Sequence, residues 1–286
     1  MKKKWLIVVI VLIAVFFLIW VTGSREKTTS SLKEKAKVSE IKEKEEPVQS
    51  LPVEDFEKLY SQAKKLISEG SLLKAKEIYK RLIQEFPDNS RLSKLESELW
   101  DLNIKILFSP LKDEYSTVYE VQPGDTLSSI ARKFKTTVGL IKKSNNLTSD
   151  IIRPGQRLKI LTAKVSIIVD KSQNKLFLKI NDEIFKAYPC STGKFNSTPT
   201  GKFKIVNKLI DPVWFKAGAI VPPESPENIL GTRWLGLDLK GYGIHGTTQP
   251  ETIGKQVTQG CIRMYNKDVE ELFDIVPVGT EVIIID

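Results

Sequence analysis

The chain contains one histidine and two cysteines, and the spacing of two of them suggests a nucleophilic site. His245 lies sixteen positions before Cys261, and a glycine directly adjoins each residue. A thiol with an unperturbed pKa of about 8.5 is mostly protonated at neutral pH, so a cysteine nucleophile needs a neighbouring base. His245 is the only imidazole available for this role. The residue types alone leave open the alternative of a packed histidine and a buried structural thiol.

The residues around Cys261 supply further candidates for the same chemistry. Glycine permits backbone conformations that other residues resist, so the N–H groups near Gly260 and Cys261 are candidate oxyanion donors. Arg263 would point to the same side of an extended chain as the cysteine. There it would bind a substrate carboxylate bidentately, or form an internal salt bridge that holds the cysteine loop. Tyr242 and Thr258 are candidates for substrate binding through proximity alone.

Four motifs in chain order resemble the signature of the L,D-transpeptidase (YkuD-like) catalytic domain. They are the Ser-Thr-Gly-Lys to Thr-Pro-Thr-Gly-Lys-Phe block at 191–203, His-Gly-Thr at 245–247, Thr-Gln-Gly-Cys-Ile-Arg-Met at 258–264 and the closing segment 268–284. The resemblance covers about residues 165–286 and implies a mainly-β catalytic domain. Gln259 departs from the pattern, because many members of the family carry a second histidine at that position.

The resemblance implies a peptidoglycan L,D-transpeptidase that acts in cell-wall biogenesis and the maintenance of cell shape. Cys261 would be acylated by a tetrapeptide stem, His245 would be the base, and the backbone carbonyl of Gly246 would orient the imidazole. Transfer to the side-chain amine of a diamino acid on another stem gives a 3→3 cross-link. Water as acceptor would make the protein an L,D-carboxypeptidase, and a lipoprotein lysine would make it an anchoring enzyme. No metal or cofactor is expected, because one histidine and two cysteines cannot build a common zinc centre.

Two other classes of protein compete with this interpretation. A non-catalytic, peptidoglycan-binding scaffold is disfavoured by the intact His, Gly-Cys and Arg positions. A cysteine peptidase of the NlpC/P60 kind is disfavoured because its cysteine precedes its histidine and opens a helix, whereas here the order is reversed and 262–264 looks extended. A Cys190–Cys261 disulfide would sequester the nucleophile, so we expect Cys190 to pack on a strand as a small apolar residue.

Short alternating segments after residue 164 must position these residues. The predicted strands are 165–169, 175–180, 203–206 and 281–285. One helix is expected near 268–275, so the domain is rich in sheet. The stretch 211–238 has no regular periodicity and is rich in Pro and Trp, which is typical of a loop that lines a cleft.

Residues 118–161 form a separate unit with a strand, helix, helix, strand order. Its Pro-Gly-Asp-Thr-Leu, Asn-Asn-Leu and Pro-Gly-Gln sequences resemble a LysM module. That resemblance implies binding of N-acetylglucosamine chains, here those of peptidoglycan. The glycan-binding residues would be Gly124, Asp125, Thr126 and the stretch from Asn146 to Ile152. The alternative is a degenerate module that only spaces the enzyme.

Residues 53–107 show helical spacing of apolar residues that is broken at Gly70-Ser71. Ala63, Ala75 and Tyr79 stand at the spacings of a tetratricopeptide repeat, but only one repeat is clear. We expect a short helical region that acts as a spacer, and the sequence names no protein partner for it. Residues 24–50 hold many charges and few large apolar residues, which favours a solvated linker or a frayed helix.

An unbroken apolar run covers residues 5–21 and follows three lysines. A helix of this length spans about 25 Å at roughly 1.5 Å per residue, close to the hydrocarbon core of a bilayer. The lysines indicate that the N-terminus stays inside and that the rest of the chain is exported. We favour an uncleaved signal anchor over a cleaved signal peptide. Either one places the catalytic part outside the cytoplasm, in the bacterial cell envelope.

The net charge of +9 in 286 residues suits an anionic partner such as nucleic acid, a phospholipid surface or an acidic wall polymer. No nucleic-acid motif accompanies the charge, so we expect peptidoglycan and the membrane as partners, and no nucleic acid. The chain is thus predicted to be a multidomain α+β protein. Its parts are a membrane anchor at 5–21, a linker at 24–50, a helical region resembling a tetratricopeptide repeat at 53–107, a βααβ LysM module at 118–161 and an L,D-transpeptidase catalytic domain at 165–286.

Overall fold

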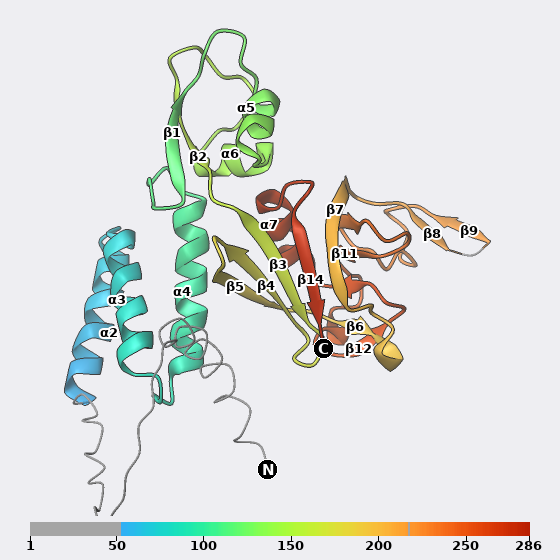
Figure 1. Ribbon diagram of the computed structural model, residues 1–286, viewed down its shortest axis with the longest axis horizontal. Helices are drawn as coiled ribbons and strands as arrows, with labels where there is room; N and C mark the ends of the chain where they lie inside the picture. Colours follow the sequence, from blue (N-terminus) through green and yellow to red (C-terminus); the bar gives the residue numbers. More distant parts are fainter. Residues whose placement is uncertain (1–52, 217) are drawn as a thin grey trace, which may run out of the picture. The chain divides into compact units, whose positions relative to one another are not determined.

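The computed structural model describes residues 53–216 and 218–286 (Figure 1). The anchor expected at 5–21 and the linker expected at 24–50 lie outside these residues. Within the described ranges, no helix combines the length and the apolar character needed to cross a membrane.

Three helices occupy the region that was expected to be helical. They are α2 (Val53–Ser68), α3 (Leu72–Glu85) and α4 (Leu92–Leu107). Their apolar faces enclose a core that includes Ala63, Ala75 and Tyr79, each fully buried. The phenol of Tyr79 donates a hydrogen bond to Glu98 Oε2 at 2.7 Å, which satisfies the one polar atom of this side chain. Gly70 follows α2 with a φ of +76°, a conformation that glycine adopts without strain.

Residues 116–161 fold as the expected strand, helix, helix, strand unit. Strand β1 (Ser116–Glu120) pairs antiparallel with β2 (Arg157–Leu161), and helices α5 (Leu127–Phe134) and α6 (Val138–Ser144) lie between them in the chain. Each helix begins at a threonine whose hydroxyl accepts a backbone N–H. Thr126 caps α5 in a reciprocal capping box with Ser129, and Thr137 caps α6.

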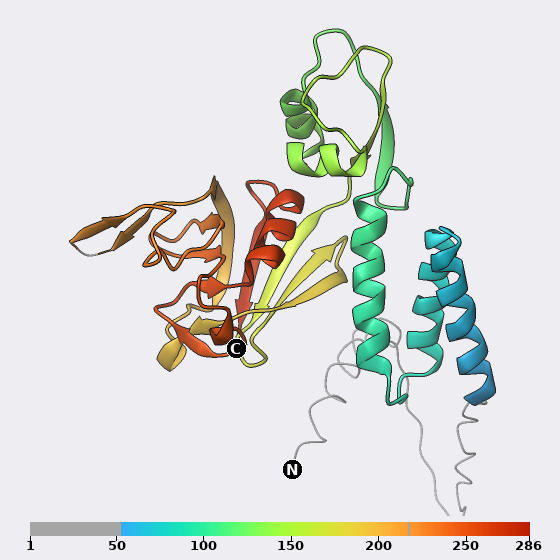
Figure 2. The ribbon, with the colours of Figure 1, turned by 180° about the vertical axis from the view of Figure 1, so that it is seen from behind.

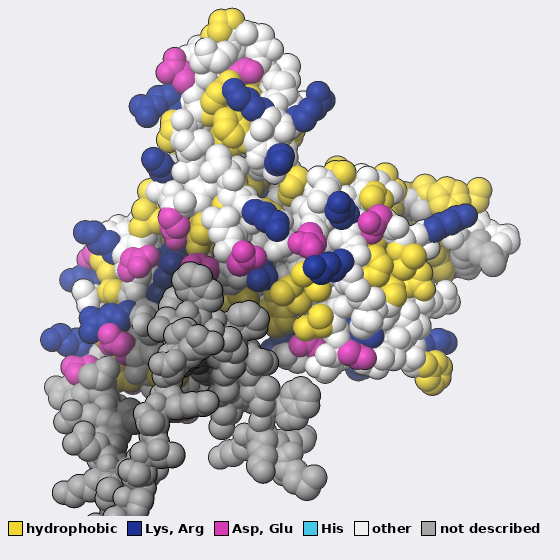
Figure 3. Space-filling model, viewed as in Figure 1, with side chains coloured by type: hydrophobic (Ala, Val, Ile, Leu, Met, Phe, Trp, Pro, Cys, Tyr) yellow, Lys and Arg dark blue, Asp and Glu magenta, His cyan; other side chains and the backbone are white. Residues whose placement is uncertain are grey.

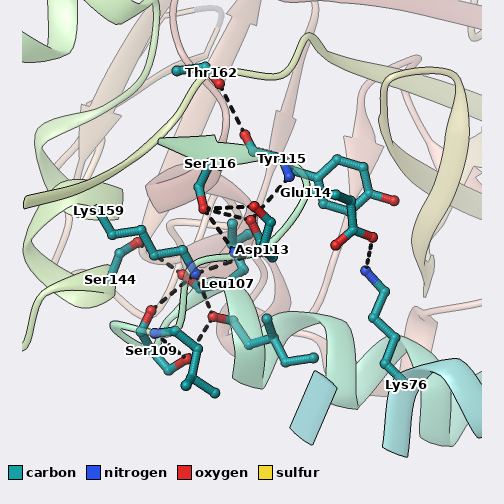
Figure 4. A network of polar contacts seen from close by, with 12 residues as sticks. Lys76, Leu107, Ser109, Asp113, Glu114, Tyr115, Ser116, Ser144, Lys159 and Thr162 are labelled. Atoms are coloured by element: carbon teal, nitrogen blue, oxygen red, sulfur yellow. Dashed lines mark hydrogen bonds and ion pairs between the residues drawn. The ribbon is translucent and has the colours of Figure 1, made fainter. Parts of the chain in front are cut away.

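A buried polar cluster joins this unit to helix α4 (Figure 4). Lys159 on β2 donates hydrogen bonds to Ile106 O at 2.8 Å and Ser109 O at 3.1 Å, two carbonyls at the C-terminal end of α4. Its ammonium also lies 3.6 Å from Asp113 Oδ2, and only 2% and 1% of these two side chains are exposed. Burial lowers the pKa of Lys159, and the nearby Asp113 carboxylate opposes this effect.

The region from residue 165 onward is built on a mixed eight-stranded sheet. In spatial order its strands are β13 (Ile262–Arg263), β11 (Gly243–His245), β10 (Arg233–Leu237), β7 (Gly201–Ile210), β14 (Glu281–Ile285), β3 (Val165–Asp170), β4 (Lys175–Ile180) and β5 (Glu183–Pro189). The pairs β14–β3 and β11–β13 are parallel, and the other neighbours are antiparallel. Helix α4 packs against the edge strand β5, where Asn103 Nδ2 donates to Phe185 O at 3.0 Å.

One face of this sheet is packed with apolar side chains under helix α7 (Asn266–Ile275; Figure 2). Leu235, Ile244 and Ile262 are consecutive register partners across β10, β11 and β13, and each is fully buried. Because side chains alternate along a strand, the neighbours of these residues must point to the opposite face. Leu140 from helix α6 joins the same core cluster, so the unit at 116–161 and the eight-stranded sheet region share apolar packing.

The prediction of an irregular loop at 211–238 is wrong in part. This stretch contains β10 and a hairpin of β8 (Trp214–Lys216) with β9 (Ala219–Val221). These strands are too short to show an alternating pattern, and β10 is buried at three consecutive residues, which hides its period. Phe215 and Ile220 on the hairpin are exposed, and Figure 3 shows hydrophobic side chains gathered there.

Candidate active site

One row of side chains crosses four strands on the face of the sheet opposite α7. Leu209, Trp234, His245 and Arg263 are successive register partners on β7, β10, β11 and β13. All four line one pocket of about 860 Å³, and Cys261 lies on the same wall. The alternation that buries Leu235 and Ile244 on one face therefore delivers the charged and aromatic residues to the other.

The pocket brings together five residues singled out from the sequence. They are Cys261, His245, Arg263, Tyr242 and Thr258. The remaining wall is largely apolar and was not anticipated residue by residue. Its members include Leu209, Val213, Phe215, Leu230 and Trp234. The sequence indicated this apolar wall only through the Pro- and Trp-rich composition of 211–238, because irregular loops of that kind commonly line clefts.

His245 is held by the backbone that follows it. Its side chain is 2% exposed, and Nδ1 lies 2.7 Å from the carbonyl oxygen of Gly246. A carbonyl can only accept, so Nδ1 carries the proton and Nε2 keeps its lone pair. Burial lowers the pKa of His245 to about 4, hydrogen bonding to Gly246 opposes this effect, and the positive charge of Arg263 adds to it.

Cys261 lies in a tight turn between β12 (Gln256–Thr258) and β13. Its side chain is half-buried, and Sγ lies 3.5 Å from Gly241 O. Burial raises the pKa of the Cys261 thiol, while the backbone N–H of Gly243 and the charge of Arg263 partly offset this rise. At neutral pH the thiol and the imidazole that line this pocket are therefore both uncharged.

The cysteine turn is closed by Thr258 and accommodates only glycine at position 260. Thr258 Oγ1 accepts from Gly260 N at 3.1 Å and donates to Cys261 O at 2.7 Å. Gly260 has a φ of +131°, and a Cβ there would lie 2.6 Å from a ring carbon of Tyr242. Because Thr258 uses the Gly260 N–H, the Cys261 N–H is the better candidate for an oxyanion donor.

The upstream motif also supports this turn. Thr198 Oγ1 donates to Gly260 O at 2.9 Å and accepts from Gly193 N at 2.7 Å. Strand β6 (Thr192–Gly193) pairs in parallel with β12, directly before the turn. The two motifs are separated by more than fifty residues in the sequence, yet they form one hydrogen-bonded unit under the cysteine.

Arg263 faces neutral oxygen atoms in this structure. Its Nη1 donates to Gln249 Oε1 at 3.2 Å and to Thr252 Oγ1 at 2.9 Å, which braces the loop between β11 and β12. The side chain is 5% exposed, and Nε has no hydrogen-bond partner among the described residues. The guanidinium thus places a positive charge near Cys261 and His245 while it holds the surrounding loop.

The residues expected to bind glycan lie on two loops of the LysM unit. Asp125 Oδ2 accepts from Tyr119 OH and from Gln122 N, each at 2.8 Å, so this carboxylate shapes the turn before α5. Gly124 has a φ of +86° in that turn, and Thr126 caps the helix. Asn146 and Ile152 lie between α6 and β2, and Asn146 lines a shallow depression of about 590 Å³.

Cys190 is fully buried after β5, and both cysteines are free thiols. Burial raises the pKa of Cys190 to about 12, and Asp170 adds to the rise. A thiol in this environment stays protonated at neutral pH and is inert.

Two family models match the chain. The L,D-transpeptidase catalytic domain (YkuD) matches residues 164–284, and the LysM domain matches residues 119–161. The sequence is 38% identical over 173 residues to YkuD of Bacillus subtilis, a protein named as an L,D-transpeptidase; the match covers 58% of this chain and 97% of that protein. YqjB of the same organism, also named as an L,D-transpeptidase, is 42% identical over 126 residues, covering 42% and 70%.

Solved structures of L,D-transpeptidases are also similar. The Mycobacterium smegmatis enzyme is 23% identical, with a TM-score of 0.36. The match covers 46% of this chain and 64% of the M. smegmatis chain, so it spans less than two thirds of that relative. The catalytic domain of the E. faecium enzyme has 25% identity and a TM-score of 0.37, with 43% and 97% covered.

Proposed function

The chain belongs to the YkuD-like family of L,D-transpeptidases, and on this premise we propose that Cys261 is its nucleophile and His245 its general base. The substrate is the tetrapeptide stem of peptidoglycan, and the product is a 3→3 cross-link to the amine of a diamino acid on a second stem. One observation carries the proposal. The chain's single imidazole and a half-buried thiol line the same pocket, and Nδ1 of the imidazole is bonded to Gly246 O.

Because both groups are neutral at rest, the proton must move during the attack. His245 Nε2 takes the thiol proton as Sγ bonds to the carbonyl carbon of the third stem residue. The carbonyl oxygen gains the negative charge, which the Cys261 N–H stabilises. The imidazolium then donates its proton to the nitrogen of the departing D-alanine, and a thioester remains on Cys261.

The second half of the reaction reverses these roles. The acceptor amine gives a proton to His245 as its nitrogen attacks the thioester carbonyl. The new amide forms, the carbon–sulfur bond breaks, and the thiolate regains the proton from the imidazolium. Arg263 supports both steps by holding the loop around the site and by favouring the transient thiolate with its charge. Tyr242 and Thr258 shape the pocket and the cysteine turn.

We further propose that the LysM unit holds the enzyme on N-acetylglucosamine chains through Gly124, Asp125, Thr126, Asn146 and Ile152. The enzyme then acts on the extracytoplasmic side of the envelope, with residues 5–21 as its membrane anchor. The family match to LysM supports the glycan-binding role. No cofactor or metal takes part in the proposed reaction.

Mass spectrometry of the protein with purified tetrapeptide muropeptides tests this function. We expect an adduct on the peptide that contains Cys261, with loss of D-alanine, followed by 3→3 dimers. Product without dimers, one D-alanine shorter, would identify an L,D-carboxypeptidase instead. Cys261→Ala should abolish both adduct and product, whereas the matched control Cys190→Ser should retain most activity because Cys190 is buried. Cross-linking that persists in Cys261→Ala would rule out the assignment.

A further inference from the structure

The indole of Trp234 lies beside the imidazole of His245 in the row of residues that forms the pocket. The two residues are register partners on β10 and β11. Their rings are nearly parallel, with an interplanar angle of 18° and centroids 6.0 Å apart. Trp234 is the nearest aromatic neighbour in this row, so its position bears directly on how the imidazole can turn.

Two glycines make room for this arrangement. Gly236 and Gly243 are register partners on the same strands as Trp234 and His245. A Cβ at Gly243 would lie 2.5 Å from Cζ2 of Trp234, and a Cβ at Gly236 would lie 2.8 Å from its Nε1. The backbone of neither glycine requires a positive φ. A Cβ at Gly236 would also lie 2.4 Å from Asn207 Oδ1, so space for the indole and for the Asn207 side chain, and not backbone conformation, explains glycine at these two positions.

A hydrogen bond fixes the indole over these glycines. Its Nε1–H donates to Asn207 Oδ1 at 3.2 Å, and Asn207 is the register partner of Gly236 on β7. The ring is thus held at one end by Asn207 and lies next to His245 at the other. Three strands cooperate to place a side chain that carries no charge and no catalytic group.

We propose that Trp234 is a positioning residue for His245, and that Asn207 and the glycine pair hold it in place. The inference rests on the proposed role of His245 as the general base. Hydrogen bonding to the backbone of Gly246 and Leu230 restrains the polar edge of the imidazole, and the indole lies beside its face. The adjacent indole limits movement of the ring and shields it from water, so that Nε2 stays neutral and available to the thiol in the shared pocket.

The electrostatic surroundings make this role measurable. Among the described residues, the charged group that shifts the pKa of His245 is the guanidinium of Arg263 on β13, and the titratable side chains of Cys261 and Tyr242 line the same pocket. Trp234 and Asn207, on β10 and β7, carry no charge. Removing the indole changes the hydration of the imidazole without removing a charge, so any change in its pKa reports on desolvation.

The single histidine of the chain allows a direct measurement. The imidazole of the full chain, produced without a histidine tag, gives one NMR titration curve. We expect the pKa to lie near 4 in the wild type and to move toward 6.5 in Trp234→Ala. Trp234→Phe keeps a ring and should shift less. Asn207→Ala removes only the hydrogen bond and should shift the pKa in the same direction. Phe215→Ala, which changes an exposed aromatic of the same pocket, is the matched control and should leave this pKa unchanged.

Acylation by a carbapenem between pH 5 and 9 gives the functional readout. In Trp234→Ala, the rate at pH 5.5 should fall about tenfold more than the rate at pH 8, because the imidazole is then largely protonated at the lower pH. A loss that is uniform across pH, or an unchanged imidazole pKa, would overturn the proposal. If Trp234→Ala does not fold, the same two measurements on Trp234→Phe and Asn207→Ala test the proposal. If His245→Ala is acylated at pH 7 as fast as the wild type, His245 is not the general base. The NMR titration of the imidazole does not depend on that role, so the two failures are distinguishable.

Discussion

At the scale of single residues, burial sets the charge of the two groups that we propose as nucleophile and base. Burial lowers the pKa of His245 and raises that of Cys261, so neither group is charged at neutral pH. This arrangement differs from a standing thiolate–imidazolium pair, in which the nucleophile is already ionised. A neutral dyad needs the imidazole at the moment of attack, because proton removal and carbon–sulfur bond formation must be coupled.

We therefore predict a strong and pH-dependent effect of His245→Ala. Carbapenem acylation at pH 7 should fall by about 100-fold or more, since general base assistance is lost. The rate should recover in part only at high pH, because burial raises the pKa of the thiol above its ordinary value and the thiol must now ionise unaided. Turnover of a muropeptide should not recover, because its amine leaving group still needs a proton. Intact-mass kinetics from pH 6 to 10 measures both, and equal rates in variant and wild type at pH 7 would contradict the prediction.

At the scale of elements, short capped helices and tight turns position the residues that are expected to bind glycan. Thr126 shows how a residue near a binding loop can have a structural task. Its hydroxyl accepts from Ser129 N at 3.0 Å, and its own N–H donates to Ser129 Oγ at 2.9 Å. Helix α5 has only eight residues, so a large share of its backbone groups depends on its ends.

Thr126→Ala should destabilise the protein by about 1 kcal/mol, the usual cost of losing a threonine cap. Thr126→Ser keeps the hydroxyl and should cost much less. Ser129→Ala should add a further loss in the Thr126→Ala background, because the backbone N–H of residue 126 still donates to Ser129 Oγ there, and only Ser129→Ala removes that second hydrogen bond. Urea unfolding measures the stabilities, and sedimentation with insoluble peptidoglycan measures glycan binding in parallel. Unchanged stability with lost sedimentation would show that Thr126 acts on the glycan and not on the helix.

At the scale of the whole described chain, the helical, LysM and catalytic regions pack against one another and are not independent domains. Lys159 joins β2 to the end of α4, Leu140 belongs to the catalytic core, and Lys143 on α6 pairs with Asp274 on α7 at 2.6 Å. Deletion of residues 118–161 would therefore expose apolar surface of the catalytic region. Point variants, and not that deletion, are the proper way to separate glycan binding from turnover.

Lys159→Met should be strongly destabilising, by about 3 kcal/mol, because it leaves Asp113 as a buried charge without its partner. The double variant with Asp113→Asn should cost less than Lys159→Met alone, since no unpaired charge then remains. Lys143→Met is the matched control, because its half-exposed ion pair with Asp274 should contribute less than about 1 kcal/mol. Denaturant unfolding measures all three variants. Equal losses in Lys159→Met and Lys143→Met would contradict a buried junction.

The sequence by itself determined the family and the LysM unit, and it supplied the prediction that Cys261 and His245 are the two reactive residues. These were readable because they rest on local patterns: motifs with fixed spacing, Pro-Gly turns, capping threonines and strands long enough to alternate. Strands 175–180 and 281–285 lie where alternation predicted them, and the unit at 118–161 has the expected strand, helix, helix, strand order. The expected membership of the L,D-transpeptidase family is confirmed by the sequence relatives.

The tertiary structure alone decided how the site is assembled and charged. The assignment of the Gly260 N–H to Thr258, the neutral partners of Arg263 and the indole of Trp234 beside His245 all depend on contacts between separate segments. The pKa of His245 likewise depends on burial, which no single segment encodes. A sequence pattern reports what a residue's immediate neighbours favour, whereas hydration and cross-strand register arise only when distant strands pair and exclude water together.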